Sequence, residues 1–334
     1  MLKDESSPIQ RGGKNAAIML FMCLVLLALI FTGMTTGVIE ISAKDFLTGN
    51  LPPETKNIIN NIRVPRVIAG ALVGMNLAMA GAIMQGVLRN PLASPGTLGV
   101  TAGAGLGAMA ILIVYPQQAF YVPLVAFVGA MVSLILVYLL SWQNNQVQPV
   151  RLILAGVALT ALFTGGMTAL MVFHADKVQG AIQWLAGSFQ GRSWNHVRMI
   201  LPYTLIGFIG TAFSGRSLNV LALGDDLAVS LGLNVRLTRL VLMSIAGLLT
   251  ASAVSVAGLL SFVGLVVPHI ARLLLGSDHE ALLPGAAIFG AALLVGADTA
   301  ARVIMQPSEV PVGVFMSFIG APFFLYLLRK RGVS

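Results

Sequence analysis

The feature that most constrains this chain is a succession of apolar stretches, each long enough to cross a lipid bilayer, that recurs from one end to the other. A helix needs about 20 residues to span a hydrocarbon core about 30 Å thick. Hydrophobic residues make up 57% of the 334 residues and charged residues only 10%, whereas soluble domains carry roughly 25% charged residues. We therefore predict an all-α polytopic membrane protein with about ten transmembrane helices.

Polar, basic or proline-containing interruptions set the boundaries of the predicted spans. The spans are residues 16–39, 66–88, 98–114, 121–141, 151–173, 199–214, 238–257, 262–275, 282–301 and 311–328. The apolar runs are continuous rather than alternating, which argues against a β-barrel. Residues 1–15 are polar and basic and are predicted to form a cytoplasmic tail, followed by a single transmembrane domain over residues 16–330.

An internal repeat relates the two halves of the chain. Three pairs of residues are each separated by 177 positions, namely Gly70 and Gly247, Gly81 and Gly258, and Pro91 and Pro268. The span at 66–88 enters from the outside and its counterpart at 238–257 from the inside, if ten spans place both termini in the cytoplasm. We therefore predict two inverted five-helix halves, at about 16–198 and 199–330, an arrangement that many transporters use to alternate access around one path.

The distribution of basic residues supports this orientation only weakly. Twelve of the twenty Lys and Arg residues fall on the predicted cytoplasmic side, as the positive-inside rule requires. The other eight are Lys44, Lys56, Arg63, Arg66, Lys177, Arg192, Arg198 and Arg302. Three of these, Arg63, Arg66 and Arg302, lie at outer ends of spans and need an explanation of their own.

Several kinds of chemistry are absent from the sequence. No G-x-x-x-x-G-K-[ST] motif is present, so ATP hydrolysis through a P-loop is excluded. The lone Cys23 excludes an intrachain disulfide and a cysteine metal site, and no H-E-x-x-H pattern occurs. We find no set of catalytic residues and predict no metal site. The net charge of +8 is attributed to basic span ends, and nucleic-acid binding is not expected because no soluble domain could carry it.

A few polar residues interrupt the apolar spans. Asn76 and Gln85 lie within the second span and either bond to a neighbouring helix or line a path. Asp298 and Arg302 are four residues apart, hence on one helix face, and are expected to pair because an isolated charge at mid-bilayer costs about 2.5–3.5 kcal/mol. The Arg89-Asn90-Pro91-Leu92 sequence ends the second span and is either a plain turn or a functional loop at the cytoplasmic mouth.

These stretches together resemble the FecCD-type permease family of ABC importers, which carries iron–siderophore, haem and cobalamin complexes. The matching pieces are RVPR at 63–66, GAIMQGVLRNPLASPGTLG at 81–99, LAGVAL at 154–159, LALGDDLAVSLGL at 221–233, FVGLVVPHIARLLLG at 262–276, DHEALLPG at 278–285, ADTAAR at 297–302, EVPVG at 309–313 and IGAPFFLYLL at 319–328. The resemblance covers residues 16–330 in order and implies ten helices per permease.

The resemblance implies roles for individual residues at both ends of the protein. Arg63, Arg66 and Arg302 correspond to arginines that pair with glutamates of an extracytoplasmic substrate-binding protein, which would explain their position on the outer side. Asn90 and Leu92 correspond to loop positions of a cytoplasmic gate.

The resemblance also implies a cytoplasmic coupling segment, within residues 216–236, that contacts the ATPase. Its assigned residues are Leu223, Gly224, Asp225, Asp226, Leu231 and Gly232. A second pair of gate residues in the cobalamin importer is polar, whereas the corresponding residues here are Pro149 and Val150, so that part of the gate departs from the pattern.

The implied protein is the transmembrane permease subunit of an ABC importer for ferric siderophore, most like a ferric hydroxamate permease, in the bacterial cytoplasmic membrane. Its implied partners are a second permease, identical or related, two ATPase subunits, the substrate-binding protein and membrane lipid. No cofactor is expected on this chain, since ATP and Mg would bind the ATPase, and the chain itself is no enzyme. The alternatives are a permease for haem or cobalamin, and a secondary transporter driven by an ion gradient.

Overall fold

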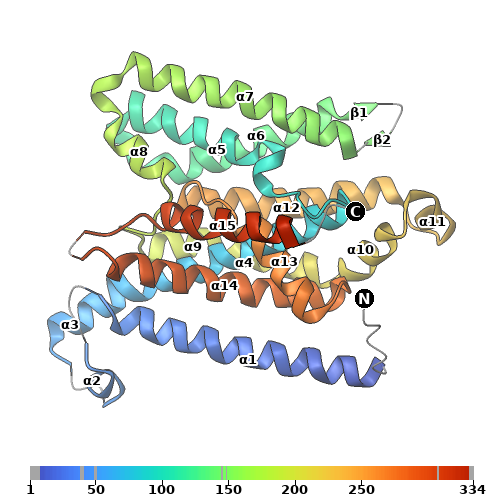
Figure 1. Cartoon of the computed structure of the whole chain (residues 1–334). Helices are drawn as coiled ribbons and strands as arrows, with labels where there is room; N and C mark the ends of the chain where they lie inside the picture. Colours follow the sequence, from blue (N-terminus) through green and yellow to red (C-terminus); the bar gives the residue numbers. More distant parts are fainter. Residues whose placement is uncertain are drawn as a thin grey trace.

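A computed structural model describes residues 8–37, 41–48, 51–143, 146–147, 149–306 and 308–330. Nearly all of these residues are helical (Figure 1). The longer helices are α1 (Pro8–Thr35), α4 (Val64–Val87), α5 (Val100–Met109), α6 (Val122–Leu140), α7 (Pro149–Phe173), α9 (Trp194–Ala212), α12 (Val235–Ala257), α13 (Val263–Leu275), α14 (His279–Val303) and α15 (Val312–Lys330). Short helices are α2 (Ala43–Thr48), α3 (Pro53–Ile58), α8 (Gln179–Leu185), α10 (Gly215–Ala222) and α11 (Asp225–Ser230), and one two-residue pair joins β1 (Trp142–Gln143) to β2 (Gln146–Val147).

The helices account for all ten predicted spans. Six helices in the described part of the chain are long and apolar enough to cross a membrane, and α9 with α10, bent by 55°, makes a seventh. Three shorter apolar helices, Val100–Val114, Val263–Leu275 and Val312–Tyr326, fall on the remaining predictions. The predicted all-α polytopic fold is therefore confirmed. Of the predicted tail, residues 1–7 lie outside the described residues and residues 8–15 form the first turns of α1.

The central helix of the bundle is α4, in which 19 of 24 residues are buried. Glycines let its backbone approach its neighbours closely. A Cβ on Gly74 would lie 2.1 Å from the carbonyl oxygen of Gly290 in α14, and a Cβ on Gly81 would lie 1.9 Å from that of Gly264 in α13. Such contacts replace the hydrophobic effect as the main cohesion between helices surrounded by lipid.

The contact between α4 and α12 shows that the two helices of the predicted repeat run in opposite directions. Asp225 pairs with Arg239 in the first turns of α12 and with Arg89 just after α4, so the end of one helix lies beside the start of the other. Asn76 donates to Ser252 at a separation of 176 residues, within one residue of the repeat offset. The repeated helices thus run antiparallel and meet near equivalent positions.

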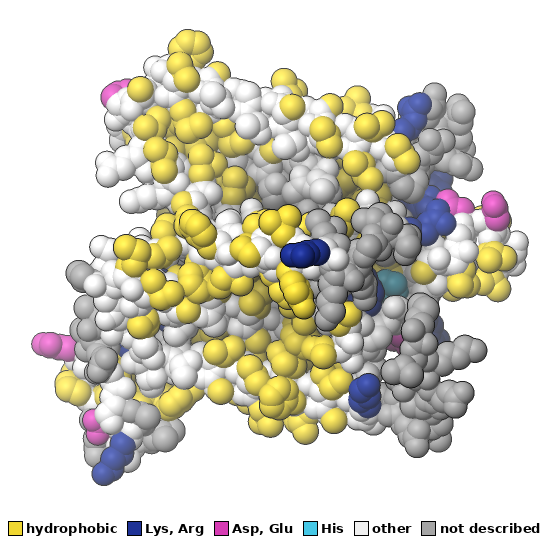
Figure 2. Space-filling model, in the orientation of Figure 1, with side chains coloured by type: hydrophobic (Ala, Val, Ile, Leu, Met, Phe, Trp, Pro, Cys, Tyr) yellow, Lys and Arg dark blue, Asp and Glu magenta, His cyan; other side chains and the backbone are white. Residues whose placement is uncertain are grey.

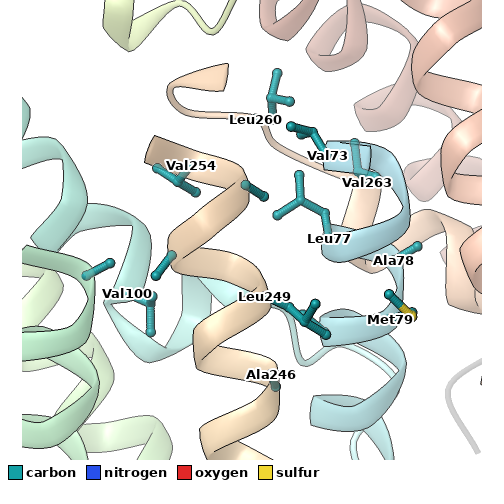
Figure 3. Packing of buried hydrophobic residues seen from close by; sticks show 14 of the residues in the cluster. Val73, Leu77, Ala78, Met79, Val100, Ala246, Leu249, Val254, Leu260 and Val263 are labelled. Atoms are coloured by element: carbon teal, nitrogen blue, oxygen red, sulfur yellow. The ribbon is translucent and has the colours of Figure 1, made fainter. Parts of the chain in front are cut away.

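Apolar side chains fill the space between these helices. In Figure 3, Leu77 and Met79 of α4 lie beside Leu249 of α12, and Leu260 and Val263 close the upper part of the same cluster. On the face drawn in Figure 2, charged side chains gather mainly at the two ends of the molecule, and hydrophobic side chains cover the band between them. This distribution matches a bundle whose long axis crosses a bilayer.

Candidate functional site

Three arginines and two carboxylates meet where α4 begins and α14 ends; we refer to Arg63, Arg66, Asp298, Arg302 and Glu309 as the outer arginine cluster. Arg66 donates through Nε and Nη2 to the two carboxylate oxygens of Asp298, both at 2.9 Å. Its Nη1 donates to Glu309 Oε2 at 2.8 Å. Arg302 Nε lies 3.5 Å from Asp298 Oδ2, so the predicted pairing of Asp298 with Arg302 is confirmed.

The other donors of the cluster hold the end of α1. Arg63 Nη1 donates to the carbonyl oxygens of Met34 at 3.0 Å and Thr35 at 2.9 Å. Arg302 Nη2 donates to that of Gly33 at 3.0 Å. No arginine of the cluster is more than 8% exposed. In this conformation the arginines bind groups of their own chain, and their docking to another protein stays a prediction.

The cluster contains three guanidinium groups and two carboxylates, and its ion pairs join Arg66 to Asp298 and Glu309 and Arg302 to Asp298. Burying charges is costly, and removing one partner of a buried ion pair lowers the free energy of unfolding by several kcal/mol. Glu309 is the more accessible carboxylate, with a side chain 24% exposed against 5% for Asp298. A group arriving from outside would therefore reach Glu309 more easily than Asp298.

The two amides of the second span are packed between helices. Asn76 is fully buried, and its Nδ2 donates to Ser252 Oγ of α12 at 3.1 Å. Gln85, 3% exposed, donates to the carbonyl oxygen of Leu265 at 3.3 Å and accepts from Arg272 Nη1 at 3.1 Å. Of the two alternatives for these residues, the structure displays the helix-to-helix bonds, and lining of a path stays a prediction.

The turn after α4, residues 88–92, is tightly organised at the opposite end of the bundle. Asn90 Oδ1 accepts a hydrogen bond from the backbone N–H of Leu92 at 2.9 Å, and the Asn90 N–H donates back to the Gln85 carbonyl at 3.1 Å. Leu92 is 49% exposed. Arg89 adopts a φ of 47°, which is unusual for a residue other than glycine. The predicted gate residues thus belong to a constrained turn in which the Leu92 side chain is exposed.

The coupling segment, residues 216–236, folds into α10 and α11, as its glycine breaks predict. Gly224 and Gly232 flank α11 with φ values of 110° and 83°, which only glycine adopts readily. Four large side chains around α11 are 57–64% exposed, namely Leu223, Leu227, Val229 and Leu231. Figure 1 shows α11 projecting beyond the ends of the neighbouring helices. We refer to α11 with these four side chains as the exposed apolar knob. Exposed apolar patches of this kind mark interaction surfaces.

A partly polar cavity that sequence reasoning did not find lies beside α4. Its volume is about 300 Å³, and it is lined by residues 94–96 and 259–262, with Leu77 of α4 among the others. Both lining segments lie at breaks between helices. Phe262, the residue directly before α13, has a φ of 67°. The signals for it in the sequence are Pro95-Gly96 and Gly258, which interrupt apolar runs without introducing charge.

No group of three or more His, Cys, Asp or Glu residues that could hold a metal ion occurs in the described parts of the chain. His279 is buried at 5% exposure, and Asn219 of α10 accepts from its backbone N–H at 2.9 Å. Asn219 also donates to Asp278 at 2.7 Å. These bonds fasten α10 to the start of α14, which is a structural role.

The inverted helical bundle, its broken helices and the exposed knob at one end define a multi-pass membrane transport protein. The chain belongs to the FecCD transport family, because the sequence model of that family matches residues 24–330. The family predicted from the sequence motifs is thereby confirmed.

Several proteins are similar to this chain over most of its length. The Fe(3+)-citrate import system permease protein YfmE of Bacillus subtilis is 41% identical over 94% of this chain and 94% of its own length. The Fe(3+) dicitrate transport system permease protein FecD of Escherichia coli is 40% identical over 94% and 98%. The cobalamin import system permease protein BtuC of Halobacterium salinarum is 42% identical over 84% and 76%.

The fold also matches a solved structure. A metal-chelate type ABC transporter in an inward-facing conformation superimposes with a TM-score of 0.86 at 29% sequence identity. The match covers 95% of this chain and 100% of that one. The arrangement of helices described above is therefore that of an ABC transporter permease.

Proposed function

We propose that this chain is the transmembrane permease subunit of an ABC importer that carries a ferric chelate of the siderophore or citrate type across the cytoplasmic membrane. The observation that carries the proposal is the full-length similarity, at about 40% identity, to permeases named for Fe(3+)-citrate, together with 37% identity to the Fe(3+)-hydroxamate permease FhuG of Bacillus subtilis. Permeases of different chelates share this scaffold, since the cobalamin permease BtuC is similarly related.

Energy would come from two separate ATPase subunits, which would bind ATP and Mg, because the chain has no P-loop. The exposed apolar knob at α11 supports an ATPase contact through the coupling segment. A second permease, identical or related, would complete the pair. This assignment places the coupling segment and both termini in the cytoplasm and the outer arginine cluster on the other side.

A substrate-binding protein would dock at the outer arginine cluster. The three arginines gathered there support an acidic partner, and the partly exposed Glu309 is the carboxylate that such a partner would displace from Arg66. Asn90 and Leu92 would help to close the cytoplasmic mouth, and the cavity beside α4 would contribute to the path. A path that must release its cargo needs weak rather than tight binding.

An ion-driven secondary transporter is the less favoured alternative. Such transporters place ionisable groups on their ion pathways. The carboxylate of Asp298 is instead held by the guanidinium groups of Arg66 and Arg302.

The substrate is tested by uptake in cells from which this chain has been deleted. Radiolabelled ferric citrate, ferric hydroxamate, haem and cobalamin are supplied separately, with and without the restored gene. We expect uptake of a ferric chelate to be lost on deletion and recovered on restoration. Loss confined to haem or cobalamin would contradict the proposed substrate class.

A further inference from the structure

Asp225, the first residue of α11, joins two arginines from different parts of the bundle. Its carboxylate accepts from Arg239 Nη2 and Nη1 at 2.8 and 3.0 Å. It also accepts from Arg89 Nη2 at 3.1 Å. Arg239 belongs to α12 and its side chain is 7% exposed, whereas Arg89 belongs to the turn after α4 and is 40% exposed. One carboxylate therefore connects the coupling segment to the ends of both repeated helices.

No other carboxylate among the described residues forms an ion pair with either arginine. Arg239 is buried, and a buried guanidinium needs its counter-charge. Asp225 is therefore held firmly at the start of α12, while its remaining lone pairs face the turn after α4. The arrangement has a fixed side, at Arg239, and a more accessible side, at Arg89.

The accessible side reaches a backbone that has been forced into an unusual conformation. Arg89 has a φ of 47°, and Gly224, directly before Asp225, has a φ of 110°. A Cβ on Gly224 would lie 3.5 Å from Arg89 Nη1, so the two turns are in contact. A strained non-glycine residue persists only where its surroundings hold it in place. The turn's own hydrogen bonds hold the backbone here, with the Asn90 N–H donating to the Gln85 carbonyl oxygen at 3.1 Å, and Asp225 binds the Arg89 side chain.

The neighbouring helix α10 is fixed differently. Asn219 and the Arg216–Glu280 ion pair, at 2.9 Å, tie α10 to the start of α14. The ion pair between Asp225 and Arg89 instead ties α11 to the turn that contains Asn90 and Leu92. The two short helices are thus tied to different parts of the bundle.

We infer that Asp225 is a positioning residue that transmits displacement of α11 to the turn at 88–92 through Arg89. The inference rests on the proposed function, in which α11 contacts the ATPase and the turn closes the cytoplasmic mouth. An ATPase that shifts α11 pulls on the Arg89 guanidinium and changes the backbone of the turn beside Asn90. ATP hydrolysis and opening of the mouth are then linked by one ion pair.

The test uses the complete complex of permease, ATPase and binding protein in proteoliposomes, with radiolabelled ferric citrate and ferric hydroxamate supplied separately as the probes. Uptake per ATP hydrolysed is measured for Arg89→Gly and Arg89→Lys. Glycine relieves the positive φ but removes the ion pair, whereas lysine keeps the charge. Glu280→Gln removes a different ion pair of the same end and is the matched control.

We expect Arg89→Gly to assemble with the ATPase and hydrolyse ATP while uptake per ATP falls at least about fivefold, the lower end of usual coupling between sites. Arg89→Lys keeps most of the coupling and Glu280→Gln keeps all of it. Wild-type coupling in Arg89→Gly would overturn the inference, because a turn that merely needs its shape tolerates glycine. Should the wild-type complex transport neither ferric chelate, the proposed function fails instead.

Discussion

Replacing Asp298 with alanine is expected to be among the most destabilising single changes in this protein. Arg66 and Arg302 are at most 8% exposed, and both face this carboxylate. Removing one partner from a buried ion pair costs about 3–5 kcal/mol, because the remaining charge is left uncompensated. We expect a large loss of monodisperse protein in mild detergent and a clear fall in its thermal unfolding temperature.

Glu309→Gln provides the comparison for this prediction. Glu309 pairs with the same Arg66, but its side chain is 24% exposed and water can replace it in part. Its loss should lower the unfolding temperature much less than Asp298→Ala. Equal stability of Asp298→Ala and the wild type would contradict the account of the outer arginine cluster as a buried structural network.

Gly81→Ala is the second change with a large expected effect. The added Cβ would lie 1.9 Å from the carbonyl oxygen of Gly264, a backbone atom that cannot turn aside. Overpacking of this kind costs typically about 1–3 kcal/mol, and occasionally more. The helices α4 and α13 would have to separate, so we expect reduced thermal stability in detergent and reduced uptake.

Gly165→Ala is the matched control, since Gly165 lies in the spanning helix α7 and a Cβ there meets nothing within 4 Å. Alanine favours a helix over glycine by about 1 kcal/mol, so this variant should be as stable as the wild type or more so. A tolerated Gly81→Ala with wild-type uptake would show that the two helices do not pack as closely as described.

The spans could be predicted from the sequence because hydropathy and length are local properties. The inverted relation of α4 and α12 followed from the spacing of a few Gly and Pro residues. The pairing of Asp298 with Arg302 was also predictable, since residues four apart lie on the same face of a helix. The pairing of Arg66 with Asp298 was not predictable, because Asp298 is 232 residues away in sequence.

Residues with positive φ were the hardest to predict. Gly224 and Gly232 indicate the breaks around α11 in the sequence. Arg89 and Phe262, in contrast, adopt positive φ without being glycine. At Arg89 the positive φ closes the C-terminal end of α4, where the Asn90 N–H donates to the Gln85 carbonyl oxygen at 3.1 Å. The cavity beside α4 escaped notice because its lining consists of short uncharged breaks inside apolar runs.

The most direct test of the central proposal is the energy source of transport. The permease is reconstituted in proteoliposomes with its ATPase and binding protein, and uptake of the radiolabelled ferric chelate identified in cells is followed with or without Mg-ATP. We predict uptake that requires Mg-ATP on the ATPase side and persists when an ionophore removes any proton gradient. Uptake that ignores ATP and follows an imposed proton gradient would contradict the assignment as an ABC importer.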